Sequence, residues 1–134
     1  MKNNRIVIGV IGHDIHVVSN RIIEIALKEY GYRVCNLGVD NIPENFIDAT
    51  VEFEACAVII SSLNGEARYW CKEIGKIFKT KNKSKVLKYL GGKLVVGNQA
   101  THEIEDEFLK YGFDRVFHRP PNLEILFDSL KKNL

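Results

Sequence analysis

The chain has 134 residues, a formal net charge of +2 at pH 7, 46% hydrophobic residues and 27% charged residues. This length suits one domain with a single core, and the composition is ordinary for a globular protein. So small a net charge gives no reason to expect nucleic acid or a membrane surface as a partner, and no apolar run approaches the roughly 20 residues of a membrane span.

Five apolar runs along the chain predict β-strands. Residues 5–11 and 56–61 are almost continuously apolar and rich in β-branched side chains, which is typical of parallel strands buried on both faces. Residues 32–37, 86–90 and 113–117 predict three further strands. Helical patterns follow these runs, so we expect the strands to be parallel.

The first two connecting segments have helical patterns. Residues 18–30 carry apolar side chains at helical spacing and are followed by Gly31, a residue type that often ends a helix. Pro43 suits the first turn of a second helix. The residues at helical spacing are Val18, Ile22, Ile25, Ala26 and Tyr30 in the first helix, and Phe46, Ile47, Thr50 and Val51, expected to be buried, in the second.

Three more helices are expected in the second half of the chain. One continuous helix is predicted over residues 66–79, and Thr101 is expected to cap the next. The pair Pro120 and Pro121 breaks the chain before the last helix.

Strands and helices therefore alternate without a linker, which predicts one α/β domain over residues 1–134. We expect a doubly wound, flavodoxin-like (Rossmann-like) fold with a five-stranded parallel sheet in the order 2-1-3-4-5. Right-handed crossovers would bring the loops after strands one, three and four to one edge of this sheet. Open α/β sheets bind their ligands at that edge.

The loop after the first strand contains an Asp-x-His motif at a strand-to-helix turn. A neutral imidazole such as that of His16 can bind a metal through one ring nitrogen while its other N–H donates to a carboxylate such as that of Asp14. The carboxylate then fixes the tautomer and raises the basicity of the ligand. The alternative reading is that these are ordinary polar loop residues.

The other two loops at this edge offer hydroxyls and bare backbone. Ser61 and Ser62 lie beside Leu63, and Gly91 and Gly92 let a ligand approach the chain without a side chain in the way. One histidine is a poor zinc site, because zinc takes three or four protein ligands. A single protein ligand makes sense when a macrocycle fills the other positions, which indicates a tetrapyrrole-like cofactor, either haem or a corrin.

At these residues the chain resembles the small, cobalamin-binding subunits of the glutamate mutase (methylaspartate mutase) family. The family pattern is Asp-x-His-x-x-Gly, then Ser-x-Leu, then Gly-Gly, and the resemblance is nearly collinear from Ile6 to Phe117. The stretches that carry it are residues 9–16, 61–63, 91–92, 95–97 and 112–116. One position departs from the pattern, because Ser19 stands where the family has glycine.

The resemblance implies a cofactor, a ligand and a set of contact residues. It implies adenosylcobalamin with His16 as the lower axial ligand of cobalt, in place of the cofactor's own base, and with Asp14 holding the far imidazole nitrogen. The nucleotide tail of the cofactor would enter a slot between the sheet and a helix. The remaining implied contacts are His13, Ile15 and Val17 on the corrin side, and Ser61, Ser62, Leu63, Gly91, Gly92, Lys93, Leu94, Val95, Val96 and Gly97 around the tail or corrin.

The resemblance also implies an activity and a partner. In the family, adenosylcobalamin starts a radical rearrangement that interconverts L-glutamate and threo-3-methylaspartate. An eight-stranded barrel typically takes ~250 residues, so this chain is too short to supply a barrel-type substrate chamber as well. A larger catalytic subunit in a hetero-oligomer is therefore expected to provide the chamber.

Three alternatives stay open. Ser19 and the side chains Glu66, Arg68 and Tyr69 leave room for a related mutase with another substrate. The chain could also be a corrinoid-binding carrier or sensor without its own reaction. A receiver-type domain without a corrin is disfavoured, because receivers need an acidic cluster after strand one and an aspartate after strand three.

The cysteines point to a reducing compartment. Cys35, Cys56 and Cys71 lie far apart without C-x-x-C spacing, so neither a zinc site nor a disulfide framework is indicated, and the first two are expected to act as small core residues. The amino terminus leads directly into a strand and has no apolar segment with a cleavage site. We therefore expect a cytoplasmic protein.

Overall fold

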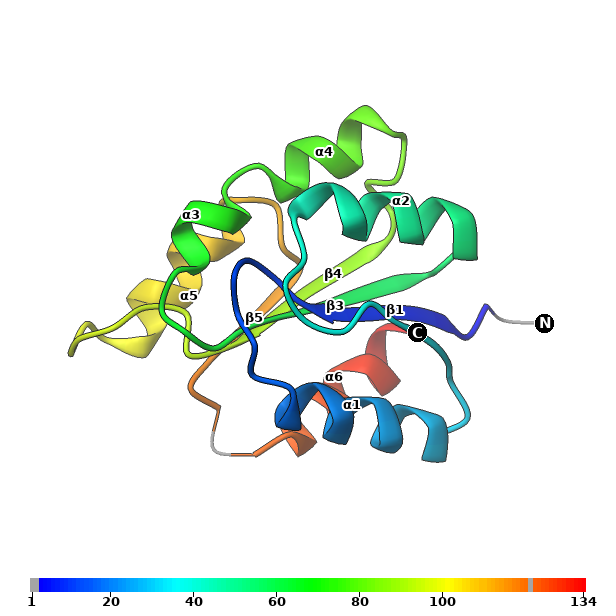
Figure 1. Cartoon of the computed structure of the whole chain (residues 1–134), viewed down its shortest axis with the longest axis horizontal. Helices are drawn as coiled ribbons and strands as arrows, with labels where there is room; N and C mark the ends of the chain where they lie inside the picture. The colour runs from blue at the N-terminus through cyan, green and yellow to red at the C-terminus, as the bar shows by residue number, and fades with distance from the viewer. Residues whose placement is uncertain (1–2, 121) are drawn as a thin grey trace.

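Five parallel strands form one sheet in the order β2-β1-β3-β4-β5 in the computed structural model, which describes residues 3–120 and 122–134 (Figure 1). The strands are β1 (Arg5–Val10), β2 (Arg33–Asn36), β3 (Ala57–Ser62), β4 (Leu87–Gly92) and β5 (Arg115–His118). The predicted α/β class and strand order are confirmed. This order places β1 beside β3, at the point where the direction of winding reverses.

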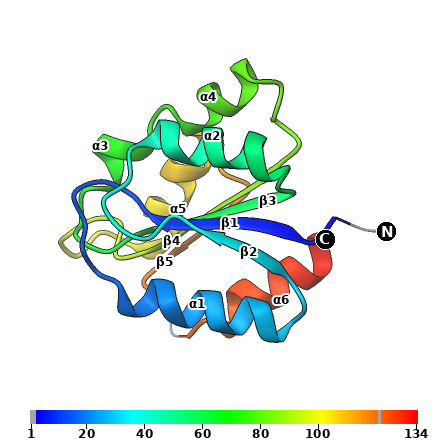
Figure 2. The same ribbon diagram turned by 45° about the vertical axis from the view of Figure 1, so that its right-hand side comes forward.

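Helices cover both faces of the sheet (Figures 1 and 2). On one face lie α1 (Val18–Glu29) and α6 (Glu124–Asn133). On the other lie α2 (Pro43–Phe53), α3 (Ala67–Cys71), α4 (Ile74–Thr80) and α5 (Thr101–Leu109). None of the helices in the described ranges has the length and apolar character of a membrane-spanning segment.

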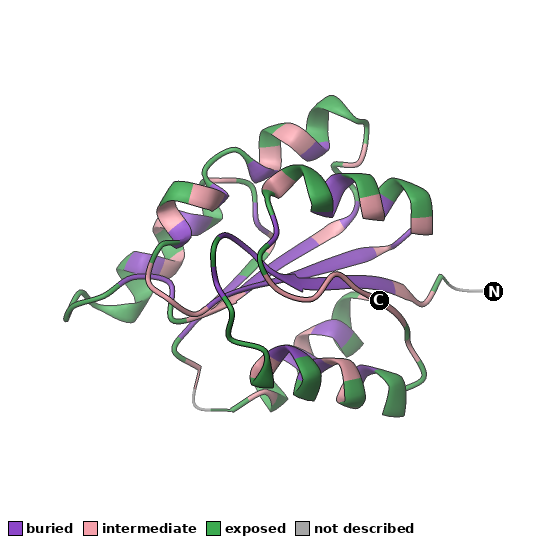
Figure 3. Cartoon of the chain, in the orientation of Figure 1, coloured by how far each residue is buried: buried purple, intermediate pink, exposed green. Residues whose placement is uncertain are grey.

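The strands are largely buried between the helices (Figure 3), and their side chains pack into two separate cores. Val7 and Ile60 pack into the larger cluster, under α2 to α5, whereas Ile8 and Ile59 pack into the smaller cluster, under α1 and α6. Because successive side chains of a strand point to opposite faces, Ser61 belongs to the α1 side of the sheet.

The ends of the strands are in register at the carboxyl edge. Val10 is paired with Ser61, Ser61 with Gly91, and Gly91 with Phe117. The loops that follow β1, β3 and β4 therefore meet at one edge, as the crossover rule predicts.

The first helix faces the core with a different side from the one that its sequence pattern suggests. α1 buries Asn20, Ile23 and Leu27. The helix is apolar on two adjacent sides, so the spacing alone does not show which side meets the sheet. The exposed apolar side chains of this region are Val18, Ile22, Ile25 and Tyr30, and in α2 Val51 is exposed as well, contrary to expectation.

The predicted helix over residues 66–79 is two helices, α3 and α4. The backbone N–H of Gly75 donates to the carbonyl of Tyr111 at 3.0 Å and so leaves the helical hydrogen-bond ladder. The prediction that Thr101 caps a helix is also wrong. Ala100, whose backbone is extended, holds the N-cap position, so α5 begins at Thr101 itself. Pro121 lies outside the described residues.

The three cysteines are free thiols. Cys71 is fully buried, and burial raises its pKa to about 12. Cys35 and Cys56 are half-buried and pack against the edges of the two cores, so they are less enclosed than expected. Burial raises the pKa of both thiols as well.

Two glycines allow α4 to lie close to the turn after α5. A Cβ on Gly112, at φ +104°, would stand 2.5 Å from the Cα of Gly75. Gly112→Ala should therefore lower the free energy of unfolding by about 2–4 kcal/mol, measured by chemical denaturation. Gly31→Ala is the matched control, because Gly31 has φ +90° but nothing near its Cβ position. It should cost about 1–2 kcal/mol, and equal losses in the two variants would contradict the packing argument.

Candidate ligand-binding site

A buried carboxylate organises the loop between β1 and α1. Only 1% of the surface of Asp14 is exposed. Its Oδ1 accepts hydrogen bonds from the backbone N–H of His16 at 3.0 Å and from the ring Nδ1 of His16 at 2.6 Å. Its Oδ2 accepts from the backbone N–H of Leu63 at 2.7 Å. The backbone N–H of Asp40 donates to the carbonyl of Asp14 at 3.2 Å, so one residue joins the loops after β1, β2 and β3.

The His16 ring faces outward from this anchor. Its side chain is 61% exposed. Because a carboxylate can only accept, Nδ1 must carry a hydrogen, and in the neutral ring Nε2 then has a lone pair directed away from Asp14. A ring with this tautomer is ready to bind a metal through Nε2. The described residues contain no group of three or more His, Cys, Asp or Glu side chains that could hold a metal ion.

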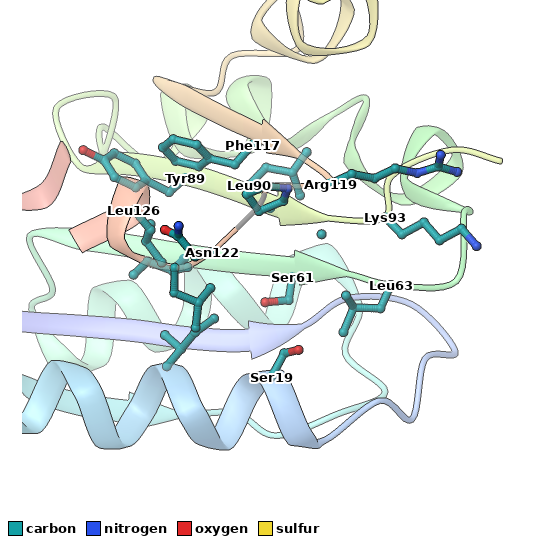
Figure 4. A pocket seen from close by; sticks show the side chains of 16 residues that line it. Ser19, Ser61, Leu63, Tyr89, Leu90, Lys93, Phe117, Arg119, Asn122 and Leu126 are labelled. Carbon is teal, nitrogen blue, oxygen red and sulfur yellow. The ribbon is translucent and has the colours of Figure 1, made fainter. Parts of the chain in front are cut away.

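A cavity of about 550 Å³ opens beside this loop, between the sheet and the helices α1 and α6 (Figure 4). Its walls are mainly apolar, and the sequence predicts five of its lining residues: Ser61, Leu63, Gly91, Gly92 and Lys93. Ser19 lines it too. The described residues that the sequence did not point to are Ile23, Ile59, Tyr89, Leu90, Phe117, Arg119, Pro120, Asn122, Leu123 and Leu126. We call this cavity the slot.

Strand alternation explains part of that missed lining. Ile59 lies two residues before Ser61 and Tyr89 two before Gly91, so each pair shares the slot face of its strand. The pattern could therefore have revealed these two residues. The contributions of α6 depend on how that helix packs, which no local signal gives.

The other predicted residues lie outside the slot lining. Ser62 points to the opposite face of the sheet, and its buried Oγ has no hydrogen-bond partner among residues 3–120 and 122–134. Leu94 and Val95 pack in the larger core. Val96 is 71% exposed, and Gly97 follows it at the surface.

His13, Ile15 and Val17 are near neighbours of His16 in the sequence. The Nδ1 of His13 lies 3.0 Å from the Oδ1 of Asp40, and its ring meets Trp70 edge-on with centroids 5.2 Å apart. Ile15 and Val17 expose their apolar side chains to solvent. These three residues share the exposed rim with His16 and are separate from the slot walls.

Trp70 explains a glycine in this loop. Gly12 has φ +82°, and a Cβ there would stand 2.3 Å from the indole Nε1 of Trp70. The indole therefore packs directly on the backbone just before the His13 rim. Its Nε1 is buried without a hydrogen-bond partner in the described part of the chain.

Arg68 and Tyr69, two of the side chains that leave room for another substrate, lie on α3 in different environments. The guanidinium of Arg68 donates to both carboxylate oxygens of Glu107, at 2.7 Å each. This pairing lowers the pKa of Glu107, and burial together with a hydrogen bond to Glu107 raises the pKa of Tyr111 to about 12. Arg68 thus ties α3 to α5, whereas Tyr69 is exposed.

A buried histidine fixes the loop after β4. The Nδ1 of His118 accepts a hydrogen bond from the backbone N–H of Leu94 at 3.2 Å. Burial, followed by the nearby charge of Arg119, lowers the pKa of His118, which favours the neutral ring that can accept this bond. The glycine end of β4 is held in place beside the slot by this contact.

Comparison with known proteins agrees with this arrangement. Residues 4–119 match the family model of the B12 binding domain. The whole chain is 42% identical to the glutamate mutase sigma subunit of Carboxydothermus hydrogenoformans and 37% identical to that of Clostridium cochlearium, and it covers 98% of each. A cobalamin-binding protein from Desulfitobacterium hafniense DCB-2 has the same fold, with a TM-score of 0.77 and 20% identity. That match covers 97% of this chain, which spans 58% of the solved one.

The fold alone does not assign the chain to a family, but sequence identity of 42% and 37% over the full length does. Together with the Asp14–His16 pair beside the slot, it shows that the chain belongs to the glutamate mutase sigma subunit family and carries a B12-binding domain.

Proposed function

We propose that this chain is the cobalamin-binding subunit of a glutamate mutase, that it holds adenosylcobalamin, and that His16 is the lower axial ligand of the cobalt. One observation carries the proposal: an exposed imidazole, oriented by the buried carboxylate of Asp14, stands beside a slot that enters the protein. Family membership supplies the class of cofactor and reaction.

The residues present fit such a cofactor. The free Nε2 of His16 suits a metal whose other positions are filled by a macrocycle. The slot volume of about 550 Å³ and its mainly apolar walls suit the nucleotide tail. Gly91 leaves its slot face bare, since the nearest described atoms that a Cβ there would meet belong to Phe117, at 3.6 Å or more.

The chain's own residues bind and orient, and the cofactor supplies the reactive bond. When bound, adenosylcobalamin provides a cobalt–carbon bond whose homolysis starts radical chemistry. Asp14 holds the His16 ring in one tautomer and one orientation, through two contacts to the same residue. The hydrogen bond from Leu63 to Asp14 keeps the slot and the ring at a fixed separation.

In this proposal, a larger barrel-type catalytic subunit binds the substrates L-glutamate and threo-3-methylaspartate. Apolar side chains are exposed around His16, namely Ile15, Val17 and Val18. Exposed apolar side chains that gather in one region are typical of an interface. The cofactor would then lie between two chains in a hetero-oligomer, and the free thiols fit a cytoplasmic location.

His16→Ala should remove the protein ligand from cobalt. We expect the wild-type chain, mixed with adenosylcobalamin, to give the absorbance spectrum of a cofactor detached from its own base. Labelling the histidines with ¹⁵N should then change the nitrogen splitting in the EPR spectrum of bound cob(II)alamin from three lines to two. His102→Ala, an exposed histidine on α5, is the control and should keep the wild-type spectra. A three-line splitting that the label does not change would contradict the assignment.

Asp14→Asn should weaken cobalamin binding by roughly 10–100-fold, as the loss of a partner behind a metal-bound histidine usually does. An amide cannot accept from His16 and Leu63 with both of its groups, so the ring loses its fixed tautomer. Long-range ¹H–¹⁵N NMR of the free chain should show the Nδ1–H form of His16 in the wild type and a mixture in the variant. An unchanged tautomer and unchanged affinity would show that Asp14 does not orient the ring.

A further inference from the structure

Ser19 occupies a position in the slot that the family pattern gives to glycine. It lies in the first turn of α1, on the wall opposite Ser61 (Figure 4). Ser61 is only 6% exposed. Neither hydroxyl has a hydrogen-bond partner within the described ranges. Two unpaired hydroxyls in a mainly apolar slot favour a ligand whose polar atoms lie between them.

The same end of the slot carries positively charged side chains and the N-terminus of α1. Lys93 and Arg119 line it, and neither forms an ion pair with another residue of the described chain. The N-terminus of α1, a helix of 12 residues, has Val17 at its N-cap and no side-chain cap. Uncapped N–H groups at a helix N-terminus attract anionic oxygen atoms.

The deeper end of the slot is different. Its wall is formed by Ile23, Ile59 and Leu126, which are apolar and buried. A ligand that matches both ends has an oxygen-rich, anionic part near Ser19 and an apolar ring system beyond it. The phosphate, ribose and base of a cobalamin nucleotide tail have this order from the corrin outward.

We infer that the Ser19 hydroxyl donates a hydrogen bond to a phosphate or ribose oxygen of the nucleotide tail, so that Ser19 makes the slot selective for corrinoids that carry the tail. This inference rests on the proposed function. Under this inference, Ser19 and Ser61 contact the tail from opposite walls of the slot. A glycine at position 19 would leave only the hydroxyl of Ser61.

The test compares two corrinoids on three forms of the chain. Cobalamin has the nucleotide tail and cobinamide lacks it, and binding of each is measured by absorbance titration. Ser19→Ala removes only the hydroxyl, and Ser19→Gly restores the family residue. Ser84→Ala is the control, because Ser84 lies in a surface loop outside the slot lining. Thermal unfolding of each variant checks that the fold is kept.

We expect Ser19→Ala to weaken cobalamin binding by roughly 5–50-fold, the range for losing a hydrogen bond to a neutral or charged acceptor, and to leave cobinamide binding unchanged. The ³¹P NMR signal of bound cobalamin should also shift between the wild type and Ser19→Ala if the acceptor is the phosphate, and stay if it is the ribose. Ser19→Gly should bind cobalamin no better than Ser19→Ala.

Three results would overturn the inference while leaving the proposed function intact. These are wild-type affinity for cobalamin in Ser19→Ala, an equal loss for both corrinoids, and tighter binding in Ser19→Gly than in the wild type, which would make the serine an obstruction. A wild-type chain that binds neither corrinoid would instead overturn the proposed function, and this inference with it.

Discussion

The buried carboxylate of Asp14 is the group on which the rest of the site depends. Removing a charge from water is costly unless hydrogen bonds replace the lost solvation. Asp14 obtains these bonds from the backbone of His16, the ring of His16 and the backbone of Leu63. The hydrogen bonds that compensate the buried carboxylate also orient the His16 ring, so the local fold and the direction of the ring have the same cause.

The two faces of the sheet have different roles. Under α2 to α5 the side chains form the larger core, which includes Leu94 and Val95 from the loop after β4. On the α1 and α6 side the slot opens near the ends of β3 and β4, where the small residues Ser61 and Gly91 leave room for it. The parity of a strand residue therefore decides which of the two cores it joins, and residues of the smaller core also form walls of the slot.

Much of this arrangement could be predicted from residues that act locally. Continuous β-branched runs indicated buried parallel strands, and the crossover rule then fixed which loops meet. The Asp14–His16 pair was recognisable because its geometry requires only two residues of spacing. The break between α3 and α4 was not predictable, because it depends on a hydrogen bond from Gly75 to Tyr111 across the structure. The same holds for the lining from α6 and for the orientation of α1, whose sequence is apolar on two sides.

The slot shares its deeper walls with the smaller core, through Ile23, Ile59 and Leu126. Whatever fills it also completes the contact between α1, α6 and the sheet. Affinity for a ligand in the slot and the stability of the fold would then be linked on this side of the molecule. Tighter binding would stabilise the packing of α1 and α6 on the sheet. In a sigma subunit of this design, a ligand bound in the slot would act as part of the hydrophobic core.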